Sequence, residues 1–179
     1  LLVPDVIPAE QALETALYVS DRYTINNAIS IDGGIRYSIY NYLGPQTMST
    51  YAPGLPRTEE NMQGTVDYAK GKFIKTYQAP EFRFSLRYAF NDSFSVKAGF
   101  NSQQQFIHSL SNTTAMAPTD IWKLSDANIQ PQRGNQVSLG IYKNFKSSTV
   151  ETSLEVYYKQ MAHYLDYKSG GQLVMNQHI

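Results

Sequence analysis

Hydrophobic and polar residues alternate with a period of two along most of this chain. Between residues 29 and 40, Ile29, Ile31 and Ile35 fall on one side, while Asp32 and Arg36 fall on the other. Successive side chains of a β-strand point to opposite faces, so this alternation predicts strands rather than helices. The same pattern recurs, and it predicts six strands over residues 12–20, 29–43, 81–90, 94–105, 136–145 and 150–160.

The connections between these segments are of two kinds. Residues 21–27, 91–93 and 146–148 are short and rich in Asn, Asp and Ser, which favour tight turns. Residues 44–79, 106–135 and 161–179 are long and carry most of the prolines. Strand, short turn, strand and long loop therefore repeat three times. This order predicts an all-β, antiparallel up-and-down meander with the short turns at one end and the long loops at the other.

Two architectures share this alternation. A soluble β-sandwich buries its apolar face against a second sheet, whereas a transmembrane barrel turns that face to lipid. The segment 29–43 is roughly three times as long as a common strand of about 5–6 residues, and Tyr and Phe gather near the strand ends. These features favour a partial transmembrane β-barrel with long extracellular loops, and the soluble β-sandwich stays as the alternative.

The charged residues of the predicted strands also favour the barrel, because nearly all of them fall on the polar face. Lys143 is the exception, and it lies beside a short turn where its stem can reach the membrane interface. We predict that the polar face lines the barrel lumen through Arg36, Arg83, Arg87, Glu151 and Glu155, with the arginines bonded to carboxylates such as Glu151 or Glu155, or to a plug inside the barrel of the full protein. The predicted lipid-facing side chains, exposed on one convex surface, are Ile31, Ile35, Ile39, Phe84, Leu86, Val96, Leu139 and Leu154.

Composition excludes several classes of protein. Among 179 residues, Lys+Arg number 15 and Asp+Glu number 15, so the net charge of zero offers no footprint for nucleic acid. The absence of cysteine excludes disulfides, thiolate metal sites and cysteine nucleophiles. No run of 18 apolar residues exists that could form a membrane helix. The first five residues do not resemble a signal peptide, so we expect the chain to be an excerpt of a longer protein.

We expect no catalytic residues, no metal ligands and no cofactor. His108, His163 and His178 are far apart and lack the spacing of metal ligands. Glu151 and Glu155 would lie roughly 13 Å apart along a strand, farther than the two carboxylates of a glycosidase. The loop serines have no histidine with a carboxylate beside them. The sequence therefore predicts a protein that is not an enzyme.

The long loops offer a different chemistry. Tyr51, Tyr68 and Tyr77 stand among uncharged polar residues of the first loop region, and Gln104 and Trp122 lie in or beside the second. Aromatic rings next to amide groups suit a sugar or peptide ligand better than a bare ion. The alternative is that these aromatic residues pack the loops against one another.

Several stretches resemble the barrel hairpins of TonB-dependent outer-membrane receptors. They are YVSDRYTIN at residues 18–26 with SIDGGIRYS at 30–38, the strand at 94–105 leading into APTDIW at 117–122, and IQPQ at 129–132. The resemblance covers essentially the whole chain. It implies that residues 1–179 are a fragment of an outer-membrane β-barrel domain, from a barrel of 22 strands that closes around an N-terminal plug.

The resemblance also implies a location and partners. It places the protein in the outer membrane of a Gram-negative bacterium, in contact with lipid, a plug domain, the remaining barrel strands and TonB, with a surface lipoprotein as an optional further partner. The implied function is binding and import of a scarce nutrient, which could be a siderophore, corrinoid, glycan or peptide. The alternatives are a soluble all-β binding module and a structural outer-membrane protein without transport.

Overall fold

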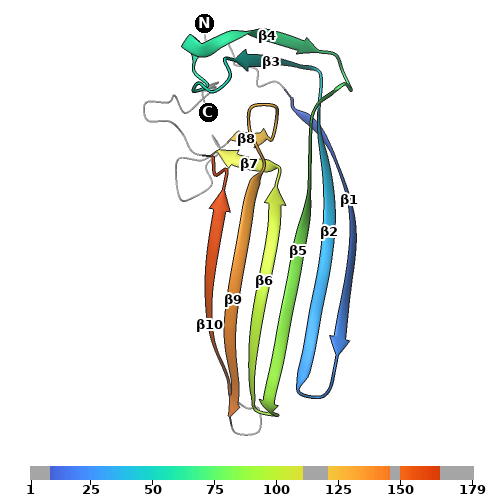
Figure 1. Ribbon diagram of the computed structural model, residues 1–179, viewed down its shortest axis with the longest axis vertical. Helices are drawn as coiled ribbons and strands as arrows, with labels where there is room; N and C mark the ends of the chain where they lie inside the picture. Colours follow the sequence, from blue (N-terminus) through green and yellow to red (C-terminus); the bar gives the residue numbers. More distant parts are fainter. Residues whose placement is uncertain (1–8, 111–120, 146–149, 166–179) are drawn as a thin grey trace, which may run out of the picture.

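The computed structural model describes residues 9–110, 121–145 and 150–165, and six long strands form its main sheet (Figure 1). Every strand pairs antiparallel with its neighbour in the order β1-β2-β5-β6-β9-β10. The predicted all-β meander is confirmed, and the sheet is open rather than closed. The strands are β1 (Gln11–Thr24), β2 (Ile29–Leu43), β5 (Phe73–Asn91), β6 (Phe94–Gln105), β9 (Gln132–Phe145) and β10 (Val150–Ala162).

Two small hairpins lie in regions that the sequence predicts as loops. β3 (Gln46–Tyr51) pairs with β4 (Met62–Tyr68), with the short 3-10 helix η1 (Glu59–Asn61) between them. β7 (Ile107–Leu110) pairs with β8 (Ile121–Leu124). Both hairpins lie at the end of the sheet opposite the short turns (Figure 1).

Several strands are longer than the alternation indicates, β5 and β1 by the most residues. β5 begins at Phe73 instead of residue 81, because β2 is long enough to pair with it, as Tyr40 does with Tyr77. Lys75, Thr76 and Gln78 hide this extension, since polar side chains there break the apolar period. β1 runs to Thr24, so Asp21 belongs to a strand rather than to a turn. Asp21 pairs with Gly33, which places it on the apolar face.

Gly44 allows β2 to turn sharply into the β3–β4 hairpin. A Cβ atom at this position would lie 2.3 Å from the carbonyl oxygen of Ala69, so no larger residue fits. The Gly44 N–H donates to the carbonyl of Lys72 at 3.0 Å, and the Gly71 N–H donates to the carbonyl of Gly44 at 2.8 Å. These bonds pin the base of the hairpin to the tops of β2 and β5.

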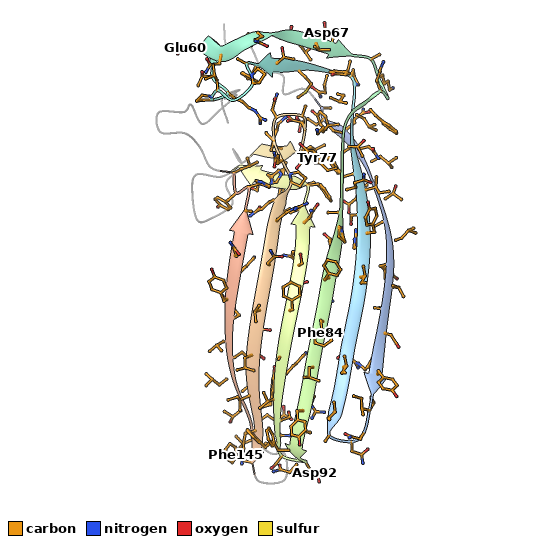
Figure 2. All side chains as sticks on the ribbon, viewed as in Figure 1. Glu60, Asp67, Tyr77, Phe84, Asp92 and Phe145 are labelled. Atoms are coloured by element: carbon orange, nitrogen blue, oxygen red, sulfur yellow. The ribbon has the colours of Figure 1, made fainter. Side chains whose placement is uncertain are left out.

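No second sheet covers the apolar face in the described part of the chain. Of the predicted lipid-facing residues, Ile35, Phe84, Leu86, Leu139 and Leu154 are 38–67% exposed, and Ile31, Ile39 and Val96 are partly exposed. Phe84 lies midway along this surface (Figure 2). Exposed apolar surface of this extent is typical of a membrane or protein contact, and a sandwich would have buried it.

The buried core lies at the loop end. It contains Tyr40, Tyr42, Met48 and Phe106, with Ala12, Tyr68, Ile74, Tyr77 and Leu124 packed around it. Tyr40 and Tyr42 come from the polar face of β2, since they alternate with Ile39. The loop segments therefore fold over the polar face and leave the apolar face uncovered.

Candidate functional site

Arg36 joins three neighbouring strands on the polar face. Its Nη2 donates to Glu14 Oε1 of β1 at 2.8 Å, and its Nε lies 3.3 Å from Glu81 Oε2 of β5. Glu81 Oε1 also accepts the backbone N–H of Gln104 in β6 at 2.7 Å. Arg36 is about half exposed, so these bonds fix side-chain positions more than they stabilise the fold.

Arg36 thus bonds carboxylates, but they are Glu14 and Glu81 rather than Glu151 or Glu155, which the prediction gives as examples. Glu151 and Glu155 lie on β10, which is four strands away from β2 in the sheet order. Glu155 instead accepts the hydroxyl of Tyr142 in the adjacent strand at 2.5 Å. In an open sheet, a side chain reaches only the strands next to its own, and the sequence alone does not say which strands those are.

A second polar link lies nearer the short turns. The Arg22 guanidinium of β1 donates to Asp32 Oδ1 of β2, and the Ser85 hydroxyl of β5 donates to Asp32 Oδ2 at 3.2 Å. Arg22, Asp32 and Ser85 occupy matching positions in the register, so their side chains share the polar face. This link continues the polar lining down to the turn end.

Arg87 and Lys97 stand directly opposite each other on β5 and β6. Neither makes an ion pair with a residue of the described ranges, and the same holds for Arg83. Like charges directly opposite across a strand pair destabilise a sheet. Two open cavities of about 380 and 350 Å³ border this pair. Asp92 and Glu151 also line the first, and Arg22 and Asp32 line the second.

Tyrosine hydroxyls hold the second loop against the polar face at its loop end. The Tyr40 ring stacks on Phe106 with 4.6 Å between centroids, and its hydroxyl donates to the carbonyl of Ser125 at 2.9 Å. The Tyr77 hydroxyl donates to the carbonyl of Asp126 at 2.7 Å. Tyr77 lies at this end of the sheet (Figure 2). Two tyrosine side chains of the main sheet thus form hydrogen bonds to the backbone of the second loop.

A mostly buried group of charged side chains also holds the second loop in place. Lys123 of β8 bonds Glu10, which precedes β1, and its Nζ lies 3.1 Å from Asp126 Oδ2. Glu10 also accepts the backbone N–H of Leu124 at 2.8 Å and the Tyr42 hydroxyl at 3.1 Å. Burial lowers the pKa of Lys123, but Asp126 and Glu10 outweigh it, so the net pKa is raised. We name Glu10, Tyr40, Tyr77, Lys123, Ser125 and Asp126 the loop anchor.

His108 and Ser125 form a buried pair inside the same region. His108 Nε2 lies 2.9 Å from the Ser125 hydroxyl, and Ser125 is fully buried. The Asp126 carboxylate bonds Lys123 and the backbone of residues 128 and 129 rather than the His108 ring. A serine without access to substrate and without a carboxylate behind its histidine is suited to structure rather than to nucleophilic catalysis.

We expect the anchored loop to loosen as the pH falls below 6.5, the ordinary pKa of histidine. Burial lowers the pKa of His108 in the docked loop, so a released loop binds the proton more readily and is favoured by acid. The protection factor of the Ser125 amide, which donates to the Phe106 carbonyl, should therefore fall between about pH 7 and 5 in the full-length protein, once the intrinsic pH dependence of exchange is divided out. His108→Gln should remove that fall; an equal fall in this variant would contradict the assignment.

The described residues contain no group of three metal-ligating side chains and no helix that is long and apolar enough to cross a membrane. The family model of the TonB dependent receptor-like β-barrel matches residues 5–177. The chain belongs to this family. Comparison with curated proteins and with solved structures gave no match. The six-stranded sheet is thus part of the barrel of a TonB-dependent receptor, as the resemblance predicts.

TonB-dependent receptors are transporters of the Gram-negative outer membrane rather than enzymes, and they work with a plug and with TonB. In this receptor chain the two faces of the sheet have the chemistry that such a barrel needs. The apolar face can meet lipid tails, and the charged face can meet an aqueous interior or a plug.

The structure separates the five predicted ligand-binding residues of the receptor. Tyr68 and Tyr77 pack beside the core, and Tyr51 lies in β3. Gln104 stands opposite Arg133, whose guanidinium can donate to its side-chain oxygen, on the outward side of β6. Trp122 of β8 is 58% exposed and is the one large exposed aromatic side chain among these five. The five residues therefore do not form a single cluster.

Sequence reasoning missed the loop anchor. Glu10 and Ser125 lie in segments without strong periodicity, and their partners are about 85–115 residues away along the chain. One local signal was available: the Asp126 carboxylate accepts the N–H groups of Asn128 and Ile129, and Asp is a residue that typically forms such Asx turns.

Proposed function

We propose that this chain is part of the wall of a nutrient importer in the outer membrane of a Gram-negative bacterium. The observation that carries the proposal is the separation of the two faces over a chain that matches the receptor barrel family along nearly its whole length. The apolar face meets lipid, the polar face meets the barrel interior, and the long loops meet the nutrient outside the cell.

Trp122 is the best candidate for a direct ligand contact. It pairs with Ser109 on the β7–β8 hairpin. The neighbouring pair, His108 and Lys123, points to the opposite side, toward the loop anchor. Because neighbouring residues of a strand point to opposite sides, the anchor holds Trp122 outward on a fixed support. A fixed indole suits stacking on a sugar or an apolar peptide side chain. Tyr51, Tyr68, Tyr77 and Gln104 complete the proposed loop set.

The polar face is proposed to meet the plug of the full-length receptor. Arg36 has its carboxylates in the sheet, but Arg83 and Arg87 have none among the described residues. We infer that acidic side chains of the plug approach Arg83 and Arg87, and that Glu151 and Glu155 face the same interior. Energy for transport comes through TonB, and a surface lipoprotein is a further proposed partner.

Uptake measurements test this function. Deletion of the receptor gene should abolish energy-dependent uptake of one nutrient, among siderophores, corrinoids, glycans and peptides, and the intact gene should restore it. Trp122→Ala should raise the concentration for half-maximal uptake about fivefold, since a lost aromatic contact is worth about 1 kcal/mol. Leu55→Ala, at a residue that is 54% exposed in the β3–β4 hairpin, is the control and should leave uptake unchanged. Unchanged uptake of every nutrient after deletion would overturn the proposal.

A further inference from the structure

The apolar band on the outward face runs obliquely across the strands. The register aligns Val19, Ile35 and Phe82 with Ser102, Asn135 and Gln160, so one row is apolar on the first three strands and polar on the last three. One row nearer the short turns, Asp21 aligns with Phe84 and Val137. The band therefore lies nearer the loops on β1 and nearer the short turns on β9 and β10.

The size of this offset matches a tilted membrane strand. Outward apolar residues, tyrosine included, centre near residue 18 on β1 and near residue 155 on β10, and the row of Glu155 meets β1 at Thr24. The shift is about six residues, or roughly 20 Å, over five strand spacings of roughly 24 Å. That corresponds to a tilt of about 40°, as for strands of membrane barrels.

Lys143 lies at the margin of this oblique band, on the side of the short turns. The outward residues of β9 run Val137, Leu139, Ile141, Lys143 and Phe145. The Lys143 ammonium lies 5.7 Å from the ring centroid of Phe94 and 5.6 Å from that of Phe145. Phe145 marks this end of the sheet (Figure 2). Two aromatic rings thus hold this outward cation at the margin of the band on the side of the short turns, where headgroups lie.

A hydroxyl donor stands beside this cation. Thr152 of β10 lies directly opposite Lys143 in the register, and Phe94 lies opposite it on the other side. The three side chains therefore occupy one outward row. An ammonium and a hydroxyl side by side can donate to two oxygens of one phosphate group, while the rings contact the upper part of the acyl chains.

We propose that Lys143 and Thr152 bind the phosphate of an anionic phospholipid in the leaflet that the short turns reach. Charge complementarity and continuity with the apolar band both favour this occupant. The inference rests on the proposed membrane location of the sheet. Bacterial barrels have their short turns on the periplasmic side, so the lipid belongs to the periplasmic leaflet.

Native mass spectrometry of the full-length receptor, titrated with phosphatidylglycerol or with phosphatidylcholine, tests the site. The wild type should bind phosphatidylglycerol more tightly than phosphatidylcholine. Lys143→Gln should weaken phosphatidylglycerol binding about fivefold, the effect of one basic residue near a charged membrane surface. Lys143→Arg should keep the affinity, and Thr152→Val should lower it less than Lys143→Gln does.

Lys97→Gln is the matched control, since Lys97 lies near the same end of the sheet but on the polar face. Equal loss in Lys97→Gln and Lys143→Gln, or no preference of the wild type for phosphatidylglycerol, would overturn the site. Uptake and membrane assembly are measured on the same variants. Intact uptake with no lipid preference would reject the phosphate site alone, whereas failure of the proposed function would appear as absent uptake in the wild type.

Discussion

Replacing Leu86 with Arg is expected to block assembly of the full-length receptor, whereas replacing Arg87 with Gln is expected to leave assembly intact. Leu86 lies in the middle of the outward apolar band, between Ile31 and Ala98 of the neighbouring strands. A cation there would face lipid near the bilayer midplane, at a cost of about 2–4 kcal/mol. Arg87 points to the polar face, where Gln remains solvated.

The readout is the amount of folded, heat-modifiable barrel in outer-membrane fractions for both variants. The two positions are adjacent in β5, so strand propensity and local backbone are matched. If Leu86→Arg assembled normally and Arg87→Gln did not, the assignment of the two faces would be inverted.

Asp126→Ala is expected to release the second loop from the polar face of the main sheet without preventing barrel assembly. The Asp126 carboxylate, whose side chain is only 6% exposed, accepts two backbone N–H groups and pairs with Lys123. Its removal leaves those donors and part of the Lys123 charge unsatisfied, which costs about 2–3 kcal/mol. That cost falls on docking of the loop, because the sheet hydrogen bonds do not involve Asp126.

Hydrogen exchange in the full-length receptor measures this effect. The amide of Ile129 should exchange roughly 100-fold faster in Asp126→Ala, while amides in the centre of β5 keep the wild-type rate. Asp67→Ala provides the control, since Asp67 is an exposed aspartate of the β3–β4 hairpin that bonds only Thr47 among the described residues (Figure 2). Wild-type exchange at Ile129 in Asp126→Ala would show that the anchor does not hold the loop.

The strands were predictable because alternation is a local property. The face on which a residue such as Ile35 lies follows from the alternation of its immediate neighbours in the sequence. The strand with which it pairs cannot be inferred from those neighbours. β5 extends up to Phe73 because β2 provides a partner there, and no hydrophobic period marks this part of the strand. Asp21 was placed in a turn for the same reason: its strand continues through polar residues.

The loop end was less predictable, since it depends on contacts between distant segments. Tyr77 was identified as an aromatic residue of interest, but its hydroxyl bonds the Asp126 backbone, 49 residues later. The assignment of Arg36 to the polar face agrees with the register, yet its partners Glu14 and Glu81 follow from strand order rather than from charge pattern. The ligand and plug roles of these residues remain predictions.

The central claim is that the face with Phe84 and Leu139 meets lipid and the face with Arg83 and Lys97 meets the barrel interior. Because this chain has no cysteine, a single introduced Cys carries a unique spin label in it. Labels at 84 and 139 in the membrane-embedded receptor should be relaxed by oxygen, which concentrates in lipid, and shielded from a water-soluble nickel chelate. Labels at 83 and 97 should be shielded from lipid-phase oxygen. Strong relaxation by the nickel chelate at 84 and 139, with oxygen reaching 83 and 97, would contradict the account.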